Sequence, residues 1–218
     1  MELQLSLLFF VEAVGTIAFA SSGAMVAIKK QLDLLGVIVL GVTTAVGGGM
    51  MRDIILGVTP PAAFSQPVYI LFSILTSTLL FAIVYTNPEI LHSRIKNKYY
   101  DKIMLWCDTA GLGIFTVVGV NTGISHGYVN YMFLLVFLGT ITGVGGGLLR
   151  DIMAGVPPYI LVKHIYACAS IVGAIVCVVL YRNFGAVVSM IGASAVVILI
   201  RYLAAHYRWN LPKLTRSE

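Results

Sequence analysis

Long stretches without charge dominate this sequence. Residues 34–51, 68–85, 131–149 and 165–181 contain no Lys, Arg, Asp or Glu. Each stretch is close to the ~20 residues that a helix needs to cross ~30 Å of hydrocarbon. Over the whole chain 59% of the residues are hydrophobic and 11% are charged, whereas a soluble domain is ~45–50% apolar. The chain is therefore predicted to be an all-α integral membrane protein.

Polar residues divide the apolar sequence into seven predicted transmembrane helices. Their ranges are 6–28, 34–58, 67–86, 104–124, 130–154, 160–181 and 185–205. The basic segment at 89–103 is predicted to be a cytoplasmic loop, and the basic segment at 206–218 is predicted to be a cytoplasmic tail. The first helix contains Glu12 and follows no basic stretch, which is typical of a permanent span and not of a cleaved signal.

The basic residues predict the orientation of these helices. With the N-terminus outside, most lysines and arginines fall on the inner side, and the outer loops keep only Arg182. The inner set is Lys29, Lys30, Arg94, Lys96, Lys98, Lys102, Lys163, Arg208, Lys213 and Arg216. Because positive residues that flank spans are retained in the cytoplasm, we expect an outer N-terminus and a cytoplasmic C-terminus.

The sequence contains an internal repeat. Residues 12–24 align with residues 108–120, and both segments begin with an acidic residue. Residues 41–61 align with residues 139–158 through the shared core VGGGxxRDIxxGV, which is followed by prolines in both copies. Nine identities in thirteen positions, at the same place within two apolar spans, indicate a duplication.

The duplication predicts the domain organisation. Repeat 1 is expected to cover 1–88 and repeat 2 to cover 104–182, with three helices each, and a separate seventh helix is expected at 183–205. Because three is an odd number of crossings, the second copy must enter the membrane from the opposite face. We therefore expect two inverted repeats, an arrangement found in many transporters.

Three consecutive glycines stand near the middle of the second and the fifth predicted helices. They are Gly47, Gly48 and Gly49 in repeat 1, and Gly145, Gly146 and Gly147 in repeat 2. A glycine inside a helix costs ~1 kcal/mol relative to alanine, so the triplets predict helices that are broken there and line a pore. The alternative is that the glycines only allow close helix packing. The mirrored recurrence favours the broken helices.

An Arg-Asp pair follows each triplet by one turn, namely Arg52 with Asp53 and Arg150 with Asp151. Ionisable groups at membrane depth cost about 2.5–3.5 kcal/mol each and are usually functional. Adjacent residues on a helix point in different directions, so the inverted symmetry predicts the cross pairs Arg52 with Asp151 and Arg150 with Asp53. The alternative is that these are interfacial charges that extend to the headgroups without a role in transport.

Each first helix of a repeat carries one acid, Glu12 or Asp108. Either could attract a cation or relay a proton, and either could equally hold a neighbouring helix by hydrogen bonds. Glu12 is the stronger candidate because Asp108 is close to a predicted helix boundary. Together with the two Arg-Asp pairs, these acids form the predicted set of pore and gating charges.

Motifs of other function classes do not occur in the sequence. There is no GxSxG or HExxH, and the glycine triplets lack the Lys-Ser/Thr of a phosphate-binding loop. Cys107, Cys168 and Cys177 lie within predicted helices and suggest neither a disulfide nor a metal site. The net charge of +5 comes from residues beside apolar spans. We therefore expect no enzyme activity, no cofactor, no metal site and no nucleic-acid binding.

The duplicated three-helix unit, the two glycine triplets and the seventh helix resemble the prokaryotic branch of the trimeric intracellular cation (TRIC) channel family. The likeness covers nearly the whole chain and is carried by Gly47–Asp53 and Gly145–Asp151 with the trailing Pro60 and Pro158. It implies a homotrimer in a prokaryotic cytoplasmic membrane, surrounded by membrane lipids, with a potassium-permeable pore in each protomer. The Lys-Glu-Val motif that animal members use for phosphoinositide binding is absent from this sequence.

Two functions remain open at this point. The favoured one is a monovalent cation channel, chiefly for potassium, because the carbonyl ends of broken helices can coordinate cations. The other is a secondary transporter of a small zwitterion such as glycine, since some bacterial relatives of this family are described as glycine transporters. An arginine and a helix N-terminus would then hold the carboxylate. A membrane scaffold is a third interpretation, which no feature of the sequence favours.

Overall fold

The computed structural model describes residues 2–92, 94–162, 165–207 and 209, and this part of the chain is all-helical. Six of its helices are long and apolar enough to cross a membrane. They are α1 (Glu2–Lys29), α2 (Leu34–Ile55), α4 (Val68–Thr86), α6 (Arg94–Ser125), α7 (Met132–Met153) and α9 (Tyr166–His206). The short helices are α3 (Ala62–Ser65), α5 (Glu89–His92) and α8 (Tyr159–Val162). The prediction of an all-α membrane protein is confirmed.

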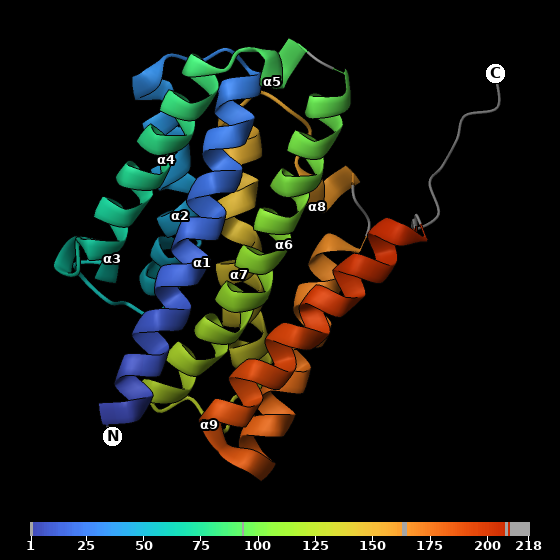
Figure 1. The fold of residues 1–218 in the computed structure, drawn as a ribbon. Coiled ribbons are helices and arrows are strands. Elements are labelled where there is room, and N and C mark those ends of the chain that lie inside the picture. The colour runs from blue at the N-terminus through green and yellow to red at the C-terminus, as the bar shows by residue number, and fades with distance from the viewer. Residues whose placement is uncertain (1, 93, 163–164, 208, 210–218) are drawn as a thin grey trace, which may run out of the picture.

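Four long helices form the centre of the bundle, and one long helix covers each flank (Figure 1). α1 packs against α2, and α6 packs against α7; the two pairs then meet through α1 with α6 and α2 with α7. α4 covers α1 and α2 on one flank, whereas α9 covers α6 and α7 on the other. The two halves of the chain therefore repeat one order of helix contacts.

Helix α9 folds back on itself at Gly185, where φ is 80° and ψ is −176°. Glycine adopts this backbone conformation far more readily than other residues. The two arms pack side by side (Figure 1): a Cβ built on Gly173 would lie 2.1 Å from a Val197 methyl group. Each arm has the length of a membrane span. The first arm begins later than the predicted 160 because α8 forms a separate turn before it.

The segment 89–103 was expected to be a loop, but most of it is helical, because α6 begins within it. Contacts with α1 hold this polar part of α6. The Tyr100 hydroxyl donates a hydrogen bond of 2.9 Å to the Met25 carbonyl oxygen, and Lys29 forms an ion pair with Asp101. The polar side chains therefore have partners that a sequence pattern of low hydropathy does not reveal.

We name the two ends of the bundle after the arginines of the repeated motif, the Arg52 end and the Arg150 end. Lys29, Lys30, Lys98 and Lys102 lie at the Arg150 end, where α1 stops and α6 begins. The rest of the predicted inner set falls outside the described side chains. These residues are Arg94, Lys96, Lys163, Arg208, Lys213 and Arg216, and most of the predicted tail at 206–218 is likewise outside the described residues.

The glycine triplets do not break their helices, and this prediction was wrong. α2 and α7 are each continuous through the triplet. The two helices cross there in backbone contact: a Cβ on Gly48 would lie 2.1 Å from the Thr142 carbonyl oxygen, and a Cβ on Gly146 would lie 2.1 Å from the Thr44 carbonyl oxygen. Because the helical hydrogen bonds stay intact, no backbone group is freed in the membrane. The glycines serve close packing instead.

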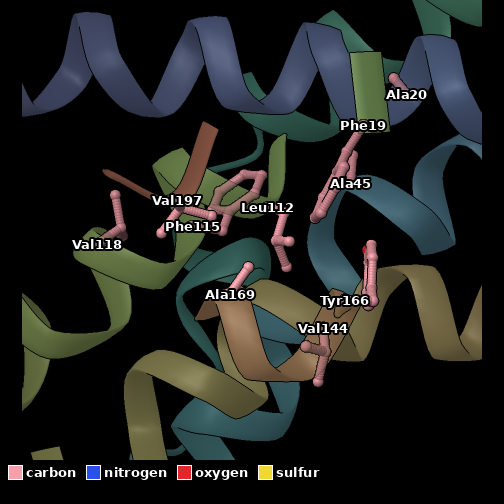
Figure 2. Packing of buried hydrophobic residues seen from close by; sticks show 10 residues of the cluster. All are labelled: Phe19, Ala20, Ala45, Leu112, Phe115, Val118, Val144, Tyr166, Ala169 and Val197. Carbon is pink, nitrogen blue, oxygen red and sulfur yellow. The ribbon is translucent and has the colours of Figure 1, made fainter. Parts of the chain in front are cut away.

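A core cluster beside this crossing joins the two halves of the chain (Figure 2). Phe19 of α1 and Phe115 of α6 occupy equivalent positions of the sequence repeat, and their ring centroids are 5.2 Å apart. The Phe19 ring fills the space over Gly111, where a Cβ would lie 2.0 Å from it. A Cβ on Gly15 would lie 2.6 Å from an Ile114 methyl group and 3.3 Å from the Phe115 ring, so Gly15 also leaves room for side chains of α6. This packing fixes α1 against α6, and thereby positions the acid that each helix carries.

Candidate functional site

Within the described residues, the buried charged side chains and the half-buried Glu12 form two clusters, one at each end of the α2–α7 crossing. Each cluster contains one Arg-Asp pair of the motif and one acid from the first helix of its repeat. The Arg52 cluster is Glu12, Arg52, Asp53 and Tyr69. The Arg150 cluster is Ser22, Asp108, Arg150, Asp151, Tyr166 and Arg201.

In the Arg52 cluster the arginine is neutralised by its own neighbour. Arg52 Nε and one terminal nitrogen donate to Asp53 Oδ1 at 2.9 Å and 2.7 Å. The other oxygen of this carboxylate, Oδ2, accepts from the Ala62 backbone N–H at 2.8 Å. Asp53 therefore ties the end of α2 to the start of α3, and it leaves the pair buried with 8% of Arg52 and 2% of Asp53 exposed.

Glu12 faces a small cavity next to this pair. Its Oε2 accepts a hydrogen bond from the Tyr69 hydroxyl of α4. The cavity has a volume of about 60 Å³, and Glu12, Thr16, Gly49 and Arg52 are among the residues that line it. A volume of this size holds a small number of waters or one small solute. The carboxylates of Glu12 and Asp53 and the guanidinium group of Arg52 thus border the same space.

The Arg150 cluster repeats the first pair of contacts. Arg150 Nε donates to Asp151 Oδ1 at 2.8 Å, and the Tyr159 backbone N–H donates to Asp151 Oδ2 at 2.8 Å. Asp151 therefore ties the end of α7 to the start of α8, just as Asp53 ties α2 to α3. The same local geometry follows the same motif in both halves of the chain.

Arg150 makes further contacts that Arg52 lacks. One terminal nitrogen donates to Asp108 Oδ1 of α6 and, at 2.6 Å, to the Ser22 hydroxyl of α1. Arg150, Asp108 and Asp151 are each only 1% exposed. This guanidinium group is therefore held by three helices. Charge-assisted hydrogen bonds of this kind are about twice as strong as neutral ones.

The predicted cross pairs are wrong. Arg52 bonds Asp53 and Arg150 bonds Asp151, each within one helix. Neighbouring residues do point in different directions on a helix, but the long arginine side chain bends back far enough to reach the next carboxylate. Asp108, which is close to a predicted helix boundary, is buried within the bundle and is only 1% exposed.

One position of the repeat contributes to the difference between the two clusters. Ser22 of the first copy aligns with Val118 of the second. Ser22 supplies a hydroxyl acceptor to Arg150, whereas Val118 lines the cavity beside Arg52 and offers no acceptor. Arg150 therefore has a hydroxyl acceptor that the repeat does not supply to Arg52 at the equivalent position.

A larger cavity lies at the Arg150 end. Its volume is about 340 Å³, and its lining includes Lys29, Met104, Asp151 and Tyr159. Burial raises the pKa of the Tyr159 phenol, so this ring is neutral at ordinary pH. Glu12 lines the small cavity and Lys29 lines the larger one, and both residues lie on α1. At 1.5 Å per helical residue, they are about 25 Å apart along this helix. The two cavities therefore flank the α2–α7 crossing, and a motif aspartate borders each one.

Arg201 was missed in the sequence analysis. It comes from the second arm of α9, is 5% exposed, and places one terminal nitrogen 4.0 Å from Asp108 Oδ2. Its guanidinium carbon lies 4.8 Å from the centre of the Tyr166 ring, a cation–π contact. The available signal was a single arginine within the apolar run VVILIRYLAA, which should have been treated as an intramembrane charge.

Comparison with known proteins identifies the family. The family model described as glycine transporter matches residues 9–85 and 105–182. The chain is 35% identical to the UPF0126 inner membrane protein YadS of Escherichia coli K12 over 94% of each chain. It is 33% identical to the UPF0126 membrane protein YvgT of Bacillus subtilis over 75% of each chain. The two matched segments correspond to the two copies of the sequence repeat.

Solved structures of TRIC channels share the fold. A TRIC cation channel studied for conductance is 33% identical and superposes with a TM-score of 0.80, covering 96% of this chain and 98% of that one. The TRIC orthologue from Rhodobacter sphaeroides is 29% identical with a TM-score of 0.82, covering 94% of this chain and 100% of its own. This chain belongs to the UPF0126 proteins, the prokaryotic branch of the TRIC family.

This family membership confirms the resemblance to the TRIC family that the repeated motif indicated. As a UPF0126 protein with six long apolar helices, this chain is a bacterial multi-pass membrane protein. Its relatives of solved structure are named as channels, and its family model is named after a transporter. The family is thus one of membrane channels and transporters and not one of enzymes.

Proposed function

We propose that this UPF0126 protein is a monovalent cation channel, chiefly for potassium, with a pore inside each protomer of a homotrimer. One observation carries the proposal: a cavity lies at each end of the α2–α7 crossing, and Asp53 borders one while Asp151 borders the other. A path that joins them would run through a single protomer. The named function of the structural relatives supports the same conclusion.

The charges along this path favour cations. Arginines near a constriction repel cations unless carboxylates neutralise them, and both motif arginines are bonded to carboxylates. With Glu12 ionised, the Arg52 cluster carries one more carboxylate than arginine. Rings of acidic side chains select cations in the same way in other channels. The cavity beside Glu12 is the expected cation site, and the hydrogen bond from Tyr69 orients the carboxylate.

The proposed topology has seven crossings. Three in the segment 1–88 and three in 104–182 would form inverted repeats, and the second arm of α9 would be the seventh. By the positive-inside rule, the lysines at the Arg150 end support a cytoplasmic position for that end. The N-terminus and the Glu12 cavity are then external, and the C-terminus and the larger cavity are cytoplasmic.

The glycine crossing is the proposed gate. Gly48 and Gly146 hold the two backbones in contact, so the cavities can join only when α2 and α7 separate. The other triplet glycines would line the opened path. The motif pairs and the acids Glu12 and Asp108 would set its charge and favour one arrangement of the helices.

A flux measurement tests the channel. The purified chain in liposomes should release trapped potassium, and Glu12→Gln should reduce the rate, because the local excess of negative charge is lost. A reference potassium channel in matched liposomes serves as the positive control. Absence of potassium flux from the wild-type chain, while the reference channel conducts, would contradict the proposal. Trimer assembly is measured independently from the mass of the purified particle in solution.

A carrier of a small zwitterion such as glycine is the second candidate. The specific observation is that Glu12 and Arg52 border one cavity of about 60 Å³, with opposite charges suited to an ammonium and a carboxylate group. Uptake of labelled glycine into the same liposomes would then saturate with concentration and fall in Arg52→Gln. A chain that conducts potassium without saturable glycine uptake excludes this candidate.

A further inference from the structure

A third cavity lies between α6 and the second arm of α9, at the Arg150 end. Its volume is about 270 Å³. Its lining includes three basic side chains, two aromatic rings and a hydroxyl group, and no carboxylate is among its described lining residues. These six are Lys102, Trp106, Thr109, Arg201, Tyr202 and His206. Neither the pair of cavities at the crossing nor the proposed transport path includes this space.

Arg201 is the buried charge of this cavity, and two of its three guanidinium nitrogens make no hydrogen bond within the described part of the chain. It is 95% buried, and the two nitrogens are Nε and one terminal nitrogen. Asp108 is paired with it only at a distance: Oδ1 is bonded by Arg150, and Oδ2, which also makes no hydrogen bond among the described residues, lies 4.0 Å from a terminal nitrogen of Arg201. Buried charged donors that make no hydrogen bond are costly, so an anion in the cavity would stabilise this guanidinium group beyond what the distant Asp108 oxygen provides.

The surroundings of Arg201 select an anion. Lys102 and His206 bring further donors to the same cavity. The ring of Tyr166 stacks on the guanidinium group and fixes its plane, and Trp106 stacks on Tyr202 with centroids 5.7 Å apart at the wall. An oriented guanidinium group matches the oxygens of a phosphate, which it can bind through two parallel hydrogen bonds.

The position of the cavity favours a lipid. Ile103 and Leu199 stand on the neighbouring surfaces of α6 and α9 and are 54% and 55% exposed. Such apolar surface suits acyl chains, and basic pockets between transmembrane helices on the cytoplasmic side bind anionic headgroups. We propose that this cavity binds the phosphate group of an anionic ligand, with a phospholipid headgroup and free phosphate as the two sources.

A binding experiment on the full chain tests the site without reference to transport. The purified protein in neutral detergent is titrated with phosphatidylglycerol, with phosphatidylcholine as the uncharged lipid, and separately with sodium phosphate against sodium chloride at equal ionic strength. The thermal unfolding midpoint reports binding. We expect phosphatidylglycerol to raise the midpoint, and Arg201→Gln to weaken its apparent affinity at least about fivefold, the effect of one surface charge on an anionic lipid.

Two further variants separate binding from folding. Lys102 is exposed, so Lys102→Gln should leave the fold intact and still weaken the affinity. Arg182→Gln removes the same charge from an exposed position beside the Gly185 turn and should change nothing. If only sodium phosphate acts, and Lys102→Gln weakens it, free phosphate is the ligand. The proposal is overturned if neither anion shifts the midpoint, or if Lys102→Gln and Arg201→Gln bind as the wild type does.

Discussion

Gly48 and Thr142 bring α2 and α7 into backbone contact, since a Cβ on Gly48 would lie 2.1 Å from the Thr142 carbonyl oxygen. The neighbouring glycine is different, because the nearest atom to a Cβ on Gly49 is an Arg52 nitrogen at 3.8 Å. The glycines of a triplet are therefore not equivalent. The middle position must be glycine because the backbone of the opposite helix leaves no room for a Cβ there. A backbone cannot rotate away from such a contact, whereas a side chain can.

Replacing the middle glycine should destabilise the protein. Gly48→Ala or Gly146→Ala forces α2 and α7 apart, and we expect a loss of about 1–3 kcal/mol in the free energy of unfolding, as for other overpacked cores. Gly49→Ala is the matched control, and it should be neutral or stabilising because alanine favours helix by ~1 kcal/mol. The free energy of unfolding of all three variants is measured in mixed micelles. Equal changes in stability for Gly48→Ala and Gly49→Ala would contradict the backbone contact between α2 and α7 at Gly48.

The two motif arginines should differ in their effect on stability. Arg150→Ala removes the guanidinium group that bonds both Asp108 and Asp151, which are each 1% exposed. Asp108 then keeps the distant Arg201 nitrogen at 4.0 Å, and Asp151 keeps its bond from the Tyr159 backbone. Breaking a buried ion pair in this way costs about 3–5 kcal/mol. Arg52→Ala leaves Asp53 its bond from the backbone and a cavity that admits water, so we expect a loss smaller by at least about 1 kcal/mol. The same unfolding assay measures the loss of stability in both variants. Identical losses would contradict the different surroundings of Arg150 and Arg52.

The helices and the family could be predicted from the sequence, because both depend on patterns along the chain. Charge-free runs have the length of a bilayer, and the motif VGGGxxRDIxxGV recurs with its spacing intact. The helical start of α6 could not be predicted in this way. Its polar residues are held by contacts with α1, such as Tyr100 with the Met25 carbonyl oxygen, and such partners are distant in sequence.

The site was predicted only in part, for reasons of side-chain reach and partner choice. The sequence supplied the identities of Arg52, Asp53, Arg150 and Asp151, but the direction of a Cβ does not determine where a guanidinium group ends. The cost of glycine in a helix was known, but the backbone that a glycine would contact was not. Arg201 was overlooked because the seventh helix lies outside the repeat and has no counterpart to compare.

Ser22→Ala should destabilise the Arg150 cluster. The substitution removes the 2.6 Å hydrogen bond from Arg150, and hydrogen bonds to charged groups contribute about 1.5–3 kcal/mol. The neighbouring Ser21 is a matched control, since its hydroxyl donates to the Ile17 carbonyl oxygen of its own helix. Ser21→Ala should change the unfolding free energy by less than about 0.5 kcal/mol. A Ser22 variant as stable as the Ser21 variant would show that this hydrogen bond contributes little.

Glu12 and Tyr69 should act as one unit in transport, and a double-mutant cycle on potassium flux measures this coupling. Glu12→Gln removes the excess negative charge of the cavity, and we expect flux to fall about tenfold, or about 1.4 kcal/mol. Tyr69→Phe removes only the hydrogen bond that orients the carboxylate. We expect about half of the ~1.5 kcal/mol of such a bond to affect permeation, which corresponds to a fall of about threefold.

The double variant separates a coupled pair from two independent residues. Once Glu12 is neutral, the Tyr69 hydroxyl no longer orients a charge, so the double variant should retain about the flux of Glu12→Gln alone. Independent residues would instead multiply their effects to about thirtyfold. Tyr85→Phe is the control on the same helix, because Tyr85 is 77% exposed at the other end of α4, and its flux should equal that of the wild type. A thirtyfold loss in the double variant would mean that Tyr69 acts on permeation by a route other than Glu12.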